Sequence, residues 1–263
     1  MNTNPDALKD KKLFVLDMDG TFYLGDRLID GSLDFIRKLS DRGVGFLFFT
    51  NNSSRTADFY CRKLAGMGCT VRESSVVTSG DVTIKYLKEN HPDAPVYLVG
   101  SPLLEESFRR EGVRLDDAGA DIVVLAFDTT LTYEKMTRAC TCIRNGALFL
   151  ATHPDLNCPT EDGFIPDCGA MCAMVTASTG VKPKYLGKPY AETVEMIKRI
   201  TGVRGEDMAF VGDRLYTDIA IGVNNGITSI LVLTGETTPA DLESSDIRPD
   251  YVFGSLGELG KAL

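Results

Sequence analysis

Seven short, nearly continuous apolar runs recur along the chain, and stretches with helical periodicity lie between most of them. Such runs are typical of parallel β-strands covered on both faces, because both sides of each strand must then be apolar. The runs are LFVLD at 13–17, GFLFFT at 45–50, VYLVG at 96–100, IVVLAF at 122–127, LFLAT at 148–152, MAFVGD at 208–213 and SILVLTG at 229–235. The pattern predicts an α/β fold built on parallel strands.

The segments between the strands carry their own signals. A helix is expected from Ser32 to near Gly43, and a second helix is expected to open at Ser53–Ser54 with Phe59, Tyr60 and Leu64 on its buried side. The segment 155–167 is dense in proline, glycine and acidic residues, which predicts a loop or a loose hairpin. A loop of that length inside an α/β unit is usually functional.

Composition excludes several classes of protein. The 263 residues predict one or two domains, and the net charge of −9 without a Lys/Arg cluster makes nucleic acid and anionic membranes poor partners. No apolar run approaches the roughly 18 residues of a membrane span, and the start MNTNPDALKDKK lacks the apolar core of a signal peptide. The seven cysteines lack zinc spacing, so we expect them to be buried small apolar residues in a reducing, cytoplasmic compartment.

Polar residues follow the strands directly, where ligands of an open parallel sheet bind. They are Asp17 and Asp19 after the first run, Thr50 and Asn51 after the second, Asp213 and Asp218 after MAFVG, and Lys188 before a helix expected near Tyr190. Each motif alone is more often a turn, a helix cap or a helix start than a site. Their common position at one predicted edge of the sheet favours a site.

These residue types suit phosphoryl transfer. Asp17 and Asp19 on extended backbone point to one side about 6.6 Å apart, at roughly 3.3 Å per residue, and a phosphorus atom fits between them. With Asp213 the site holds too much negative charge to stand alone, and Mg²⁺ suits such carboxylates together with substrate phosphate. Lys188 adds a positive charge, and the Thr50 hydroxyl with the amides after it offers hydrogen-bond donors.

The motifs DMDGT, FFTNNS, GKP and GDRLYTD, in this order, resemble those of the haloacid dehalogenase superfamily of phosphohydrolases. The longer stretches DMDGTFYLGDRLIDG and GDRLYTDIAIG resemble subfamily IIA, with the NagD-type nucleotide phosphatases and the nitrophenyl phosphatases. The resemblance covers nearly the whole chain. It implies a Rossmann-like, doubly wound parallel sheet core with an inserted α/β cap domain of the C2 type.

The resemblance also implies roles for the residues. Asp17 would be the nucleophile that forms an aspartyl phosphate, and Asp19 the general acid and then the base that activates water. Thr50, the Asn51 amide and Lys188 would bind the phosphoryl group. The Mg²⁺ ligands would be Asp17, the backbone carbonyl of Asp19 and Asp213, with Asp218 supporting them. Such a pair of carboxylates has its pKa values pushed apart.

Motif spacing locates the cap. Thr50 lies only 31 residues after Asp19, whereas Lys188 lies 138 residues after Thr50, far more than one βα unit needs. The expected division is a core of residues 1–90 and 183–263 with a cap of residues 91–182. The stretch 153–170 resembles the substrate-facing cap loop. Within it, Asp155 and Cys158 are candidate contacts to the leaving group, with solvated loop residues as the equal alternative. His153 is expected to be a loop residue before Pro154, with a catalytic role as the minority alternative.

The leading hypothesis is a Mg²⁺-dependent phosphomonoesterase that acts on nucleoside monophosphates, sugar phosphates or similar small esters, and on nitrophenyl phosphate in vitro. A dehalogenase would lack the acid at Asp19, and a mutase usually carries its cap between the first two motifs. A dinucleotide-binding protein would need G-x-G-x-x-G after the first strand. The alternative from another class is a non-catalytic phosphometabolite-binding module that kept the fold. The natural substrate and the oligomeric state stay open, with a homodimer through the cap as one alternative.

Overall fold

The computed structural model describes residues 4–117, 119–160 and 163–263. By their contacts these residues form two compact units, which are described separately. The first unit holds the described residues of 4–50, 60–77 and 188–263, and the second holds those of 51–59 and 78–187.

The first unit is built on a six-stranded sheet in the order β14-β13-β12-β1-β4-β5. Strand β1 pairs in parallel with both β12 and β4, and β13 pairs in parallel with β12 and β14. All four residues of β1 are buried, as expected for a strand covered on both faces. The strands are β1 (Leu13–Leu16), β4 (Gly45–Thr50), β5 (Val76–Thr78), β12 (Met208–Gly212), β13 (Thr228–Val232) and β14 (Tyr251–Phe253). The sheet confirms the predicted α/β class.

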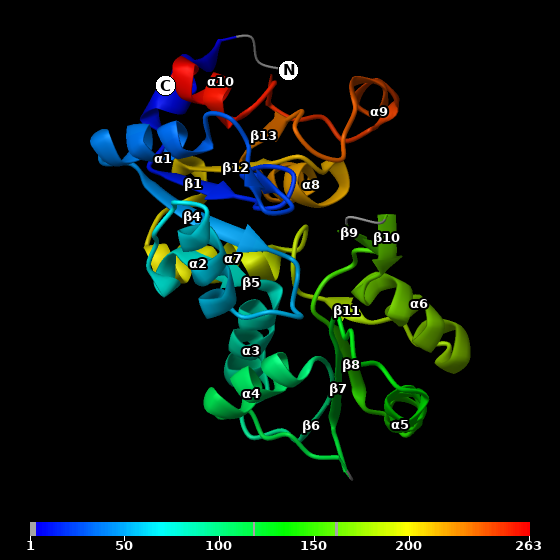
Figure 1. The fold of residues 1–263 in the computed structure, drawn as a ribbon. Helices are drawn as coiled ribbons and strands as arrows, with labels where there is room; N and C mark the ends of the chain where they lie inside the picture. The colour runs from blue at the N-terminus through cyan, green and yellow to red at the C-terminus, as the bar shows by residue number, and fades with distance from the viewer. Residues whose placement is uncertain (1–3, 118, 161–162) are drawn as a thin grey trace. The chain divides into compact units, whose positions relative to one another are not determined.

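Helices cover both faces of this sheet. Figure 1 shows α1 and α10, which pack against each other, on one side of the sheet and α7 on the other. The helices are α1 (Ser32–Asp41), α2 (Ala57–Gly66), α7 (Ala191–Thr201), α8 (Ala220–Asn225), α9 (Pro239–Ser244) and α10 (Leu256–Ala262). Short 3₁₀ turns lie at Pro5–Asp10, Glu73–Ser75 and Gly205–Asp207, and a π-helical turn lies at Leu215–Ile219. A small hairpin of β2 (Tyr23–Leu24) and β3 (Arg27–Leu28) follows β1.

The second unit has its own parallel sheet, in the order β11-β8-β7-β6. In Figure 1 helices α3 and α4 lie on one side of this sheet and α5 and α6 on the other. The elements are β6 (Val96–Val99), β7 (Ile122–Leu125), β8 (Leu148–Ala151), β11 (Lys184–Tyr185), α3 (Ser79–Asn90), α4 (Pro102–Arg110), α5 (Tyr133–Arg144) and α6 (Cys168–Thr179). An antiparallel hairpin of β9 (Asn157–Thr160) and β10 (Gly163–Pro166) precedes α6, in agreement with the hairpin expected at 155–167, of which residues 161–162 lie outside the described residues.

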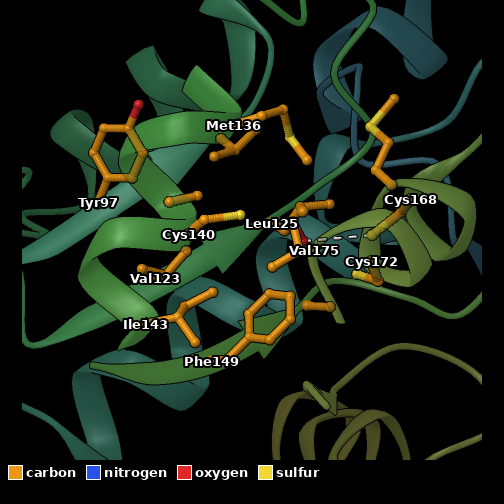
Figure 2. Close-up of a cluster of buried hydrophobic side chains, with 14 of the residues drawn as sticks. Tyr97, Val123, Leu125, Met136, Cys140, Ile143, Phe149, Cys168, Cys172 and Val175 are labelled. Carbon is orange, nitrogen blue, oxygen red and sulfur yellow. Dashed lines mark hydrogen bonds between the residues drawn. The ribbon is translucent and has the colours of Figure 1, made fainter. Parts of the chain in front are cut away.

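The apolar core of the second unit lies between its sheet and the helices α5 and α6. Figure 2 shows Val123, Leu125 and Phe149 from the strands packed against Met136 and Cys140 of α5 and the cysteines of α6. Each side chain of this size that is fully buried contributes about 1.5–3 kcal/mol to folding. Of the seven cysteines, all are free and four are buried, but Cys61, Cys142 and Cys158 are partly exposed. The expectation that all seven are buried is therefore wrong for these three.

Two sequence-based boundaries differ from the structure. The helix expected at Ser53–Ser54 begins at Ala57, because the Thr56 hydroxyl accepts the hydrogen bond from the Phe59 amide while Ser53 and Ser54 belong to a loop. Helix α3, which the expected division assigned to the core, groups with the second unit. Its contacts explain this grouping, since Lys88 pairs with Glu111 and Lys184 lies over the Tyr86 ring. No helix within the described residues has the length and hydrophobicity to cross a membrane.

Candidate active site

A tight turn after β1 places the first acidic motif. The Asp17 amide continues the ladder by donating to the Val211 carbonyl at 2.9 Å. Gly20 then adopts φ +85°, and a Cβ at this position would lie 2.5 Å from Oδ2 of Asp213. Only glycine fits here, because both the left-handed conformation and the close approach exclude a side chain. The turn between Asp17 and Gly20 is therefore packed directly against the Asp213 carboxylate.

The loop after β12 supplies two further carboxylates. Oδ1 of Asp213 accepts a hydrogen bond from the Thr21 hydroxyl at 3.0 Å, and Oδ2 accepts one from the Glu236 amide at 2.7 Å. The π-helical turn that follows brings Asp218 back to the strand end, where its Oδ2 accepts the Arg214 amide at 3.1 Å. Such π-helical turns occur frequently at functional sites. Asp213 and Asp218 are both nearly fully buried.

Lys188 joins these two loops. Its ammonium nitrogen lies 2.6 Å from Oδ1 of Asp17 and 2.6 Å from Oδ1 of Asp218. The lysine side chain is only 4% exposed, so these ion pairs are shielded from water. The structure thus brings together four of the predicted residues, from three separate motifs: Asp17, Lys188, Asp213 and Asp218.

The charge of this cluster suits a divalent cation. Asp17, Asp213 and Asp218 each offer a carboxylate oxygen, and these oxygens lie within 4.8 Å of one another. Three carboxylates and one ammonium sum to a charge of −2, which one divalent cation neutralises. Oxygen-only donors favour a hard cation such as Mg²⁺. The side chains of this cluster therefore fit the metal that the sequence motifs imply.

The pKa values in the cluster reflect the same excess of negative charge. Burial raises the pKa of Asp17 well above its usual value, against the opposing effect of Lys188, and the neighbouring carboxylates raise it further. Burial and the Asp218 carboxylate raise the pKa of Asp213 to about 6. Burial lowers the pKa of Lys188, but Asp17 and Asp218 outweigh that effect and hold it above its usual value. Lys188 therefore keeps its charge, and without a metal Asp17 and Asp213 hold their protons to higher pH than an ordinary aspartate does.

Asp19 and Thr50 lie in the same unit. Burial raises the pKa of the half-buried Asp19, and the nearby charge of Lys63 partly offsets this effect. The Lys63 ammonium is itself placed 4.4 Å above the centre of the Tyr23 ring and 3.3 Å from Oδ1 of Asp26. Thr50 is the last residue of β4, which pairs with β1. It therefore stands at the carboxyl edge of the sheet, as the sequence predicted.

The other predicted residues belong to the second unit. The Asn51 side-chain amide donates to Oδ1 of Asp155 at 3.1 Å, and Asp155 is only 3% exposed. The alternative that Asp155 is a solvated loop residue is therefore wrong, since its carboxylate is buried against Asn51. Cys158 lies in β9, with its thiol 3.7 Å from the carbonyl oxygen of Pro159. Contact of Asp155 or Cys158 with a leaving group stays a prediction.

Sequence reasoning did not find the buried polar group around His153. This side chain is fully buried, and its Nε2 lies 2.9 Å from Oδ1 of Asp167, so it is more than a loop residue before Pro154. Burial lowers the pKa of His153, but the Asp167 carboxylate raises it more, to about 9. The only signal in the sequence is the pair of residues itself, 14 positions apart in a proline-rich segment, which says nothing of their contact.

Comparison with known proteins places the chain in a family. A model described as haloacid dehalogenase-like hydrolase matches residues 14–114, and a related HAD-hydrolase-like model matches residues 185–259. An acid sugar phosphatase of Staphylococcus epidermidis is 39% identical over 252 residues, which cover 95% of this chain and 96% of the relative. The chain belongs to the haloacid dehalogenase-like hydrolases.

Two further relatives of this haloacid dehalogenase-like hydrolase show to which kind of hydrolase it is similar. The 5'-nucleotidase YutF of Bacillus subtilis is 36% identical over 251 residues, covering 95% of this chain and 98% of YutF. The crystal structure of a 4-nitrophenylphosphatase from Thermotoga maritima superposes with a TM-score of 0.94 at 50% identity, covering 97% of this chain and 98% of that one. The protein is a phosphatase of the branch that contains the nitrophenyl phosphatases and NagD. The predicted family, fold and phosphomonoesterase activity are confirmed.

Proposed function

We propose that this phosphatase hydrolyses small phosphomonoesters in two steps, with Asp17 as the nucleophile and Mg²⁺ as the cofactor. The observation that carries the proposal is the buried ion pair of Lys188 with Asp17 inside a cluster of three carboxylates. A lysine that neutralises a buried carboxylate keeps it available for attack on an anionic phosphate.

In the first step an Asp17 oxygen bonds to phosphorus and the bond from phosphorus to the leaving oxygen breaks. Asp19 gives its proton to that oxygen, and its raised pKa supports a protonated starting state. In the second step Asp19 takes a proton from water, the water oxygen bonds to phosphorus, and the bond to Asp17 breaks. Inorganic phosphate leaves, and Asp19 again carries a proton.

The remaining residues bind and orient the phosphoryl group and the metal. Lys188 offsets the charge of the transferring group, and the Thr50 hydroxyl and Asn51 amide hold its oxygens. Asp17, the backbone carbonyl of Asp19 and Asp213 would hold Mg²⁺, with Asp218 in support. The metal supplies electrostatic stabilisation of the phosphoryl oxygens.

The substrate class follows from the relatives. Names such as acid sugar phosphatase and 5'-nucleotidase support sugar phosphates and nucleoside monophosphates as substrates. Seven free cysteines support a reducing, cytoplasmic compartment.

The experiment is a measurement of phosphate release from a panel of sugar phosphates, nucleoside monophosphates and nitrophenyl phosphate. It is made after chelation and again after addition of Mg²⁺, with Asp17→Asn as the inactive control. We expect Mg²⁺-dependent release from several esters and none from the variant. Full turnover by the chelated enzyme, or by Asp17→Asn, would overturn the mechanism.

A further inference from the structure

A chain of buried hydrogen bonds in the second unit leads to Asn51, and the mechanism above gives no role to His153, Ser79 or Asp167. At its centre is His153, whose Nδ1 lies 2.9 Å from the Thr152 hydroxyl oxygen and 3.3 Å from that of Ser79. On the other side of the ring, Nε2 lies 2.9 Å from Oδ1 of Asp167. All four side chains are buried. The ring is thus held from both sides by residues of different elements.

The chain continues from Ser79 to Asn51. The Ser79 hydroxyl donates to the Asn51 carbonyl oxygen at 2.5 Å. The Asn51 side chain is held as well, because its amide donates to Asp155. On its other side lies Gly187, where a Cβ would stand 2.7 Å from Oδ1 of Asn51. Main chain and side chain of Asn51 are therefore both fixed within the second unit.

The hydrogen-bond partners of His153 indicate the protonation state of its ring. Nε2 must donate, because it faces a carboxylate oxygen that also accepts the Cys168 amide at 2.6 Å. Ser79 gives its only proton to Asn51, so Nδ1 is attracted to the Ser79 oxygen only if Nδ1 also carries a proton. A neutral ring could accept a hydrogen bond from Thr152 at Nδ1 but would only face the Ser79 oxygen, whereas the imidazolium can donate to both oxygens. The raised pKa of His153 agrees with the imidazolium. The proton on Nε2 lies between His153 and Asp167, where a metal bound to both residues would have to replace it.

We propose that His153, clamped by Asp167, is a positioning residue that holds Asn51 through the Ser79 hydroxyl. Its task is to fix the backbone of the residue whose amide binds the phosphoryl group, and this inference rests on the proposed function. His153 touches no reacting atom, and its effect on rate passes through two hydrogen bonds.

The first test is Ser79→Ala, which removes one hydroxyl from the N-terminal end of a helix and leaves no unpaired charge. We expect kcat/KM for nitrophenyl phosphate to fall roughly two- to twelvefold, the equivalent of one hydrogen bond. The inhibition constant for inorganic phosphate should rise in parallel, because the same amide holds it. The matched control is Ser107→Ala, which removes a hydroxyl of another buried serine, one that donates to the Leu103 carbonyl within α4. Its kinetics should match those of the wild-type enzyme.

The second test uses His153→Gln together with Asp167→Asn, so that the Asp167 carboxylate is not left buried without its cation, while Asp155 keeps its hydrogen bond from Asn51. This double variant should lose activity by a similar or larger factor. Adding Ser79→Ala to it should then cost less than about twofold, because the two changes interrupt one chain of contacts. If His153 had only a structural role, Ser79→Ala and the double variant would each lower Tm, and their effects on kcat/KM would be independent.

The outcomes separate this proposal from the proposed function. Wild-type turnover that Asp17→Asn abolishes supports the mechanism. If Ser79→Ala then behaves like Ser107→Ala, or if the losses multiply, the positioning role is overturned and the mechanism stands. Binding of inorganic phosphate, measured by calorimetry on the same variants, tests the positioning role without turnover. Unchanged phosphate affinity in Ser79→Ala would overturn it even if the mechanism failed.

Discussion

The ammonium nitrogen of Lys188 lies 2.6 Å from Oδ1 of Asp17, and the two side chains are only 4% and 14% exposed. Lys188 makes a second contact of the same length to Asp218. One buried cation therefore serves both the expected nucleophile and a carboxylate of the metal cluster. Removal of this charge should act on catalysis and on metal binding in opposite directions.

Lys188→Met should lower kcat by roughly 10²–10³-fold on every ester, since it removes a charge that stabilises the transferring phosphoryl group. The same change should tighten Mg²⁺ binding by more than about tenfold, because the cation no longer faces a like charge. Steady-state kinetics and calorimetric Mg²⁺ titration give both numbers. Lys12→Met, at an exposed lysine paired with Asp207, is the control and should change neither. Weaker Mg²⁺ binding in Lys188→Met would contradict this account of the cluster.

Metal binding should depend on pH through Asp213. Its pKa is about 6 in the metal-free fold and 3.8 ordinarily, so between these values the folded protein holds more protons than the unfolded chain. This group's contribution to stability is therefore full below its ordinary pKa and is lost as the pH rises through about 6. Mg²⁺ takes the place of the proton, so its apparent affinity should fall about tenfold per pH unit below about 6.

The measurement is the rise in Tm on addition of Mg²⁺ at about pH 5 and at about pH 7.5. We expect the larger rise at about pH 7.5, because Asp213 has then lost its proton. Asp213→Asn, which cannot titrate, should show a small rise at both values. An equal rise at both pH values in the wild-type protein would show that Asp213 does not give up a proton to the metal.

Asp19→Asn should separate the two chemical steps. Nitrophenolate leaves without a proton, because its pKa is roughly three units below the value of about 10 for tyrosine, so formation of the aspartyl phosphate should hardly slow. Its hydrolysis needs Asp19 as base and should slow by about 10²–10⁴-fold. Rapid mixing should therefore show a burst of nitrophenolate near one per active site, whereas sugar phosphates are slowed already in the first step. Equal slowing on both kinds of ester without a burst would assign Asp19 a structural role.

Substrate discrimination should depend on the exposed side chains of the β9–β10 hairpin rather than on the buried residues around it. Phe164 is 70% exposed, whereas Asp155 and Asp167 are buried in the second unit. Phe164→Ala should change the ratio of kcat/KM between a nucleoside monophosphate and nitrophenyl phosphate by roughly tenfold. Tyr133→Ala, at an exposed aromatic residue of α5, is the control and should leave the ratio unchanged. An unchanged ratio in Phe164→Ala would remove this residue from substrate recognition.

Much of the fold followed from local patterns. The apolar runs correspond to strands such as β1, β4 and β12 because a strand covered on both faces needs apolar residues on both sides. The residues directly after these strands meet at one edge of the sheet, because the carboxyl ends of parallel strands lie together. Asp17, Lys188, Asp213 and Asp218 could therefore be predicted as one cluster from their positions after strands and before helices.

The grouping of the segments was decided only by the tertiary structure. Residues 51–59 follow a core strand, yet they belong to the second unit, where Asn51 meets Asp155 and Ser79. His153 looked like an ordinary residue before a proline, but it is buried against Asp167 and Ser79, which lies 74 positions away. Periodicity reports only which face of a segment is apolar. Which polar groups share a buried hydrogen bond depends on the approach of distant segments, because each buried donor must find an acceptor wherever the fold supplies one.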